Sequence, residues 1–206
     1  MYVPPAYRET RADVLHALVR AHPLGTLVTA GAAGLTANLI PFALVETAGG
    51  MVLRAHLARA NPQCDDLRAG AETLVIFQGP EAYVTPSWYA AKAEHGRVVP
   101  TWNYAVVQVR GRPQVFDAPD WLAAQVGRLT EGHEAGRAHP WAVSDAPEAF
   151  IAGQLRAIVG LEIPIERIEG KWKMSQNRSE ADRSGVAEGL RAEGAEAAAD
   201  LVVPRP

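Results

Sequence analysis

Short apolar stretches separated by glycine and proline run through the first half of the chain. Pro4 and Pro5 keep the start of the chain extended. Apolar residues then recur on one face of residues 11–21, which predicts a helix that ends before Pro23. Six further stretches rich in β-branched or aromatic residues predict strands over residues 25–30, 35–45, 51–56, 73–78, 82–85 and 105–116, the last broken by Gly111 and Pro113. Between two of them, residues 62–70 suit a short helix.

The spacing of these strands indicates how they pair. Most follow one another too closely for a helical crossover, so the sheet is expected to be mainly antiparallel. Glycines at 31–34 and 49–50 stand where hairpin turns would form. A meander without a long exposed edge favours closure into a barrel. We therefore expect a mainly β fold with flanking helices (α+β), built on an antiparallel barrel.

The second part of the chain is more helical. Its pattern predicts helices over residues 120–132, 147–159 and 179–201, with a strand over 160–167 after the second helix. We expect a single domain over residues 1–189 and an Ala/Glu-rich helical tail over 190–206, whose last three residues would fray.

Composition and charge narrow the class of protein. Of the 206 residues, 48% are hydrophobic and 21% charged, as in ordinary soluble domains. The net charge of −3 gives no overall attraction to nucleic acid. The single cysteine, Cys64, cannot form an internal disulfide, which fits a reducing cytoplasm. No secretory signal or membrane-spanning stretch is expected, so the predicted location is cytoplasmic.

The segment from His56 to Pro62 is a candidate anion site. It leads from a strand into a short helix, where free backbone N–H groups favour negative charge, and Arg59 adds a planar donor group for phosphate oxygens. Asn61 suits the N-cap of that helix, with Pro62 at its first position. The alternative is a capped helix beside a solvated arginine.

Other polar residues stand in apolar or aromatic surroundings. Asn38 lies in an apolar strand before Pro41, where its amide faces either a ligand or the neighbouring backbone. Residues 83–89 and 99–104 are rich in Trp and Tyr, which suits either a slot for a flat ring or simple packing. Residues 171–178 combine three cations with amides and Trp172, as in a phosphate clamp or a solvated face. No metal motif, Walker A loop, Rossmann fingerprint or GxSxG is present.

Several of these segments, in this order, resemble the PaiB-type family of FMN-binding negative transcriptional regulators. The matching blocks are MYVPPAYRE, TANLIPFAL, HLARANPQ, YVTPSWY, VPTWNYAVVQVRG and KWKMSQNRSEADRSGV. They extend to about Gly189, so the resemblance covers nearly the whole chain.

The resemblance implies a split β-barrel related to pyridoxamine-phosphate oxidase, with FMN bound at the interface of a homodimer. It implies that His56, Arg59 and Asn61 hold the FMN phosphate and that Asn38 borders the flavin ring. On the far side of the site it places Thr101, Trp102, Asn103, Lys171, Lys173 and Gln176. No metal is implied.

Four functions remain open at this point. The chain could be a flavin-dependent oxidoreductase, in which FMN supplies the chemistry. It could be the transcriptional regulator that the family name suggests, although the acidic chain offers DNA only the basic patch at 171–178 and Arg183. The barrel could hold haem on His56 or His95, or a deazaflavin. It could also be a partner-binding module with a vestigial flavin site.

Overall fold

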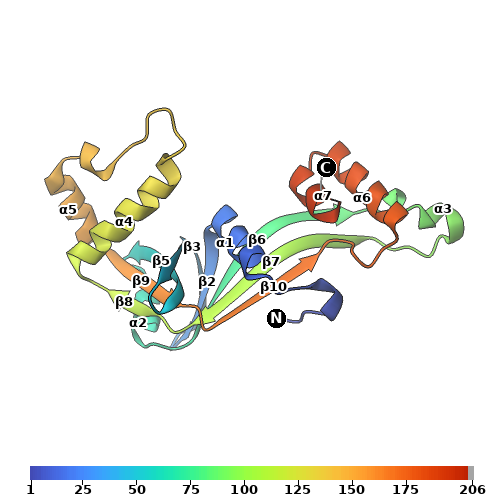
Figure 1. Ribbon diagram of the computed structural model, residues 1–206. Coiled ribbons are helices and arrows are strands. Elements are labelled where there is room, and N and C mark those ends of the chain that lie inside the picture. The colour runs from blue at the N-terminus through green and yellow to red at the C-terminus, as the bar shows by residue number, and fades with distance from the viewer. Residues whose placement is uncertain (204–206) are drawn as a thin grey trace. The chain divides into compact units, whose positions relative to one another are not determined.

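The computed structural model describes residues 1–203 and divides them into two compact units (Figure 1). The first unit consists of residues 1–22, 77–108 and those from Glu169 onward, and the second of residues 23–76 and 109–168. Three strands contribute residues to both units: β6 (Thr73–Val84), β7 (Thr101–Gly111) and β10 (Arg167–Lys173). The predicted fraying of residues 204–206 lies outside the described residues.

The second unit contains two antiparallel sheets. In one sheet the order is β6-β2-β3, and in the other it is β4-β5-β9-β8. Its further strands are β2 (Leu24–Gly31), β3 (Gly34–Pro41), β4 (Ala43–Thr47), β5 (Gly50–Ala58), β8 (Gln114–Phe116) and β9 (Ile158–Pro164). Its helices are α2 (Gln63–Arg68), α4 (Pro119–Glu134), the 3₁₀ turn η3 (Val143–Asp145) and α5 (Glu148–Arg156).

Alternation along the strands builds the core of this unit. On β5, Leu53, Ala55 and Leu57 are buried, and Leu161 and Ile163 of the paired strand β9 are buried as well. The hairpin turns fall at the predicted glycines, where Gly34 and Gly50 adopt positive φ angles that other residues avoid. The segment that carries Arg59 lies between β5, a strand of this core, and α2.

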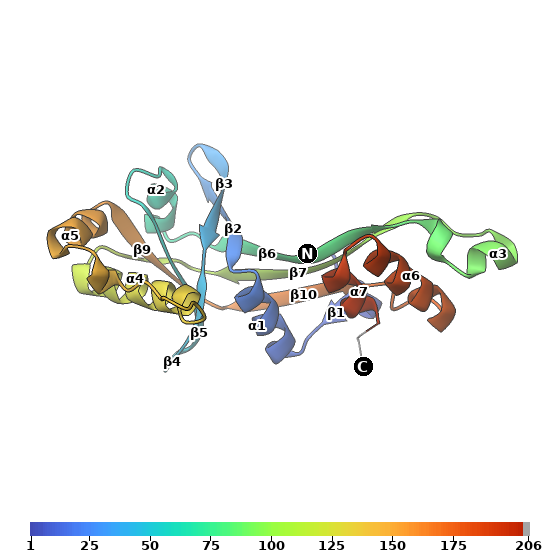
Figure 2. The same cartoon turned by 90° about the horizontal axis from the view of Figure 1, so that it is seen from above.

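The first unit combines four strands with helices at both chain ends (Figure 2). The strand order is β1-β10-β7-β6, and α6 packs against α7. The remaining elements are η1 (Pro5–Tyr7), β1 (Arg8–Glu9), α1 (Ala12–Ala21), η2 (Pro86–Trp88), α3 (Ala91–His95), α6 (Glu180–Ala192) and α7 (Glu196–Val202). Leu15, Val107 and Val186 lie in its core.

The predicted mainly β, antiparallel fold with flanking helices is confirmed, while several element boundaries differ. The predicted strand 35–45 is two strands, because the N–H of Phe42 donates to the Pro23 carbonyl at 2.8 Å and leaves the ladder. The predicted strands 73–78 and 82–85 are one continuous strand, β6. The predicted helix 179–201 is two helices, because Gly194 adopts a φ of 79° between them. The domain bounds at 189 and 190 stay a prediction.

Candidate functional site

Arg59, at the end of β5, is held in one orientation by the chain around it. Its Nε donates to the Arg156 carbonyl at 3.0 Å, its Nη2 to the Ile158 carbonyl at 2.8 Å, and its Nη1 to Asp117 Oδ1 at 2.5 Å. A guanidinium has five N–H donors, so two remain for a ligand. The side chain is 42% exposed, so these donors can reach solvent. The guanidinium of Arg59 is therefore held in one orientation and still has N–H donors available for a ligand.

Further charges gather around Arg59 and define what we call the Arg59 cluster: Arg59, Arg68, Asp117 and Arg156. Arg68 Nη2 lies 3.4 Å from Asp117 Oδ2. The hydrogen bond from Arg59 holds the pKa of Asp117 below its usual range, so this carboxyl is ionised near neutral pH. The guanidinium groups of Arg59 and Arg68 against one carboxylate leave the cluster positive, which suits a phosphate group.

A cavity of about 580 Å³ opens beside this cluster, entirely within the second unit. Its lining joins Arg59, Asp117 and Arg156 to apolar side chains of α4 and α5, which are Pro119, Leu122, Ala152 and Leu155. Pockets that bind cofactors typically combine such apolar walls with a few placed polar groups. The residues present therefore fit a ligand with one anionic end and one apolar part, which describes FMN.

His56 lies on β5 directly opposite Gly160 of β9. A Cβ on Gly160 would lie 2.2 Å from the ring of Trp121, so the first turn of α4 lies against this face of the sheet. Burial lowers the pKa of His56, and its Nδ1 is enclosed without a hydrogen-bond partner among the described residues. Its role as a phosphate ligand stays a prediction, and its neutral form adds no positive charge.

The amides of Asn61 and Asn38 are used within the protein. The six-residue helix α2 begins at Gln63 with Pro62 as its N-cap, so the predicted N-cap at Asn61 is one residue early, and Asn61 Oδ1 accepts the N–H of Gln63 at 3.0 Å. Asn38 Nδ2 donates to Gln63 Oε1 at 3.0 Å. Both amides thus have partners within the protein, Asn38 with a side chain of α2 and not with the neighbouring backbone, and their predicted contacts to FMN stay predictions.

Gln63 is a residue that sequence reasoning missed. It is fully buried on α2, and its Nε2 lies within hydrogen-bond distance of the Leu27 and Thr36 carbonyls and of Thr29 Oγ1. Through these bonds it fixes α2, and with it the Arg59 segment, to β2 and β3. The sequence signal for this residue was its position directly after Asn61-Pro62, at a predicted helix start, where unpaired backbone groups need partners.

The six remaining predicted site residues all lie in the first unit, on β7, β10 and the turn after β10. Asn103 is buried, and its amide is paired with the hydroxyl of Ser175 at 3.0 Å. Trp102 is 54% exposed and meets Tyr83 edge to face at 6.0 Å. Of the predicted aromatic residues, Tyr83 and Trp102 thus form an exposed pair. Trp88 instead packs against α6 at Gly185 and Gly189.

The two lysines of this group lie against tyrosine rings. Lys171 Nζ is 5.2 Å from the Tyr104 ring centroid and 5.8 Å from that of Tyr2. Lys173 donates to Thr101 Oγ1 and to the Trp102 carbonyl, and burial lowers its pKa. Gln176 turns back on its own segment, donating to the Trp172 carbonyl and accepting from the Met174 N–H. The structure therefore gathers the predicted residues into two groups, one in each unit.

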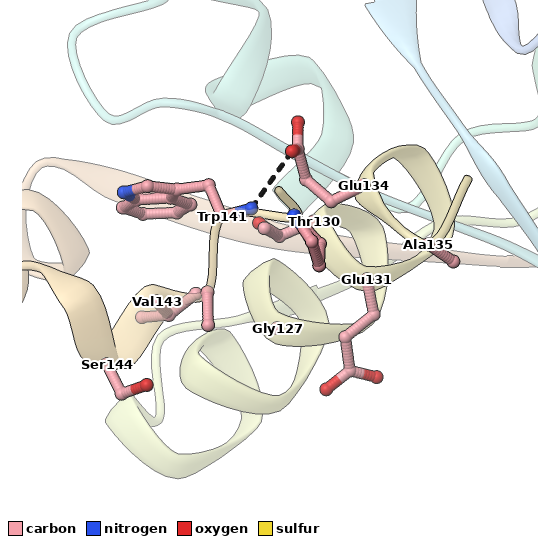
Figure 3. Close-up of a pocket in the computed structure, with 10 residues that line it drawn as sticks. Gly127, Thr130, Glu131, Glu134, Ala135, Trp141, Val143 and Ser144 are labelled. Carbon is pink, nitrogen blue, oxygen red and sulfur yellow. Dashed lines mark hydrogen bonds between the residues drawn. The ribbon is translucent and has the colours of Figure 1, made fainter. Parts of the chain in front are cut away.

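Another cavity in the second unit contains none of the predicted residues. It has a volume of about 370 Å³ and lies between α4 and the segment up to η3, with Trp141 on one wall (Figure 3). Glu131 and Glu134 line it, and Glu134 accepts the N–H of Trp141 at 3.0 Å. These two carboxylates make it a poor site for a phosphate.

Two further observations concern other classes of site. Residues 1–203 contain no group of three or more His, Cys, Asp or Glu side chains placed to hold a metal ion. Within the same residues, no helix combines the length and the apolar character needed to cross a bilayer. Cys64 is buried, and burial raises the pKa of its thiol.

Comparison with known proteins assigns the chain to a family. Residues 1–167 match the family described as "Putative FMN-binding domain". The protease synthase and sporulation protein PAI 2 of Bacillus subtilis is 32% identical over 193 residues, covering 94% of this chain and 90% of that protein. An uncharacterised protein of Emericella nidulans is 35% identical over 233 residues, covering 96% and 93%.

A solved structure supports the same assignment at the level of the fold. The FAD and haem binding protein of Mycobacterium smegmatis superposes with a TM-score of 0.61 at 20% identity, over 81% of this chain and 73% of that chain. The two antiparallel sheets with flanking helices are thus those of the flavin-binding split barrels. The chain therefore belongs to the PaiB-type FMN-binding family, whose cofactor is FMN.

Proposed function

We propose that the Arg59 cluster holds the phosphate of FMN and that the adjoining cavity receives part of the same cofactor. One observation carries this proposal: an arginine fixed by three bonds keeps two donors free beside an apolar cavity of about 580 Å³. Because the guanidinium is already ordered, binding a phosphate costs little further side-chain entropy. The contacts of His56, Asn61, Asn38 and the first-unit group stay predictions.

The test is a visible absorption titration of the purified protein with FMN. Arg59→Ala should weaken FMN binding by roughly 10- to 100-fold, since a hydrogen bond between charged groups contributes about 1.5–3 kcal/mol. Arg128→Ala is the matched control, because it removes an exposed arginine of the same unit that does not line this cavity. Equal weakening by both substitutions would contradict the proposal.

We also propose that two copies of the chain associate through β3. On this edge strand the side chains of Leu35, Ala37, Leu39 and Pro41 point the same way and are all exposed, with Leu35 at 81%. A continuous apolar row of this kind is typical of an interface. Light scattering should give a dimer for the native chain and a monomer for the double substitution Leu35→Glu and Leu39→Glu. A native chain that is monomeric at all concentrations would contradict this.

For the biological role, we propose regulation of gene expression through the flavin, in the cytoplasm. The relative in Bacillus subtilis carries a name that connects it with protease synthesis and sporulation. The cations of the basic patch already have contacts within the protein, which disfavours binding to DNA phosphates. Lys171 and Lys173 lie against the ring of Tyr104, and Arg183 Nη2 donates to the Val202 carbonyl at 2.7 Å. We expect no strongly salt-dependent binding to duplex DNA in a gel-shift assay, and such binding would favour direct repression instead.

A flavin-dependent oxidoreductase is the second candidate function. It is favoured by the cofactor of the family, because FMN itself supplies redox chemistry. Turnover of a nicotinamide cofactor with FMN bound, absent from the Arg59→Ala variant at limiting FMN, would support it.

A further inference from the structure

A small cavity of about 100 Å³ in the first unit is built around a buried tyrosine. We call it the Tyr89 pocket. The polar and aromatic side chains that line it are Tyr7, Tyr89, Thr101, Asn103, Lys173, Ser175, Asn177 and Arg178. They come from η1, from the segment after η2, from β7, and from β10 with the turn after it, so the fold brings together four separate parts of the sequence.

Tyr89 is the unexplained member of this pocket. Only 3% of the residue is exposed, yet its O–H donates to no described residue, and the group beside it is the guanidinium of Arg178, which is itself a donor. Buried hydroxyl groups nearly always have a partner, so the missing acceptor calls for a ligand. Burial raises the pKa of this hydroxyl, and the charge of Arg178 offsets that effect in part, so it remains a proton donor at neutral pH.

Positive charge surrounds this donor. The guanidinium of Arg178 lies 4.6 Å from the Tyr89 ring centroid. Lys173 uses two of its three N–H groups on Thr101 and the Trp102 carbonyl, which leaves one. Neither cation forms an ion pair with a carboxylate among residues 1–203. The nearby carboxylate of Asp182 accepts the N–H of Ala91 at 3.0 Å.

Three polar side chains of the pocket are already matched. Asn103 and Ser175 are buried and bond to each other, and Thr101 Oγ1 accepts from Lys173. Three donors of the pocket lack an acceptor: a hydroxyl, an ammonium N–H and a guanidinium. An acceptor with negative charge satisfies all three at once, whereas a neutral or cationic ligand does not.

We propose that the Tyr89 pocket binds a small oxyanion, the carboxylate or phosphate group of a molecule other than FMN. Its volume suits one such group and is well below the roughly 300 Å³ at which pockets for ring-sized ligands begin. The proposal rests on the proposed function only in assigning the FMN phosphate to the Arg59 cluster.

The experiment is a calorimetric titration of the full chain with inorganic phosphate and with acetate, at constant ionic strength, with and without bound FMN. We expect one saturable site per chain in both forms. Arg178→Gln should weaken binding about tenfold or more and Tyr89→Phe about fivefold, as for one charged and one neutral hydrogen bond. Arg97→Gln and Tyr83→Phe are the matched controls, since neither side chain lines the pocket, and both should bind as the native chain does.

The outcomes separate this proposal from that for FMN. Absence of saturable binding to the native chain, or equal weakening in the controls, would overturn it. Exclusion of phosphate by FMN, together with loss of FMN but not riboflavin binding in Arg178→Gln, would overturn it too, because the pocket would then hold the FMN phosphate. If the native chain does not bind FMN at all, the proposed function fails, and the titration of the FMN-free protein still decides the oxyanion site.

Discussion

The Arg59 cluster and the Tyr89 pocket are both positively charged, but they are built in opposite ways. In the Arg59 cluster the cation is exposed, fixed by three bonds, and partly neutralised by Asp117, beside a cavity of about 580 Å³. In the Tyr89 pocket the hydroxyl is buried without an acceptor, and the two cations beside it are half-buried, around a volume of about 100 Å³. The first arrangement suits the charged end of a large ligand, and the second suits a small anionic group.

The contacts that support the two sites also differ, so a substitution can disturb one site without disturbing the other. Hydrogen bonds of Gln63 anchor the Arg59 segment, whereas close packing of η2 on α6 positions Tyr89. Substitutions in one support should change one ligand and spare the other.

The largest effect is expected for Gln63→Leu. The substitution keeps the volume and leaves the Leu27 carbonyl, Thr29 and Asn38 without their buried partner, at a cost of roughly 2–4 kcal/mol in the free energy of unfolding. Urea unfolding measures the loss, and FMN titration should show weaker binding with phosphate binding unchanged. Gln114→Leu, at an exposed position of β8, is the control. A loss no larger than that of the control would show that the network does not anchor α2.

Gly185→Ala should act on the other site. A Cβ at this position would lie 2.2 Å from the carbonyl oxygen of Trp88, so η2 must move, at roughly 1–3 kcal/mol. We expect weaker phosphate binding by calorimetry and unchanged FMN binding. Gly132→Ala on α4 meets no atom within 4 Å and should stabilise the protein by about 0.5–1 kcal/mol through helix propensity. Destabilisation by both would contradict the account.

Asp117→Asn is expected to raise FMN affinity about fivefold, since it removes one negative charge, worth about 1 kcal/mol, beside the phosphate. The phosphate affinity of the Tyr89 pocket should not change. Weaker FMN binding in this variant would mean that Asp117 orients Arg59 more than it repels the ligand.

The smallest effect concerns acid stability. The hydrogen bond from Arg11 lowers the pKa of Glu9 to about 2 from 4.5. A carboxyl whose pKa is lowered on folding stabilises the fold above its unfolded pKa, and this contribution is lost as the pH falls from about 4.5 to 2. Glu9→Gln should therefore flatten the stability profile slightly in that range. An unchanged profile would show that the ion pair contributes nothing measurable.

The fold followed from the sequence because its signals are local. Strand alternation, the glycines at 34 and 50 and the helix before Pro23 each depend on neighbouring residues. The break at Phe42 and the continuity of β6 depend on tertiary hydrogen bonds, which a short stretch of sequence does not reveal.

The candidate site was only partly predictable. Arg59 was singled out because it stands before a predicted helix start, and the resemblance to the family implied its role toward the phosphate. Asp117 and Arg156 lie 58 and 97 residues away along the chain and become its neighbours only through folding. Tyr89 was missed for a similar reason, since a tyrosine without a partner cannot be distinguished from a packed one before burial and hydrogen bonds are known.

The assignment of the FMN phosphate to Arg59 is tested most directly by the ratio of FMN affinity to riboflavin affinity, which isolates the phosphate. We predict that the native chain prefers FMN by roughly 10- to 100-fold or more, and that Arg59→Ala removes most of this preference while riboflavin binding stays the same. A preference for FMN that persists in Arg59→Ala would contradict the account and place the phosphate elsewhere in the chain.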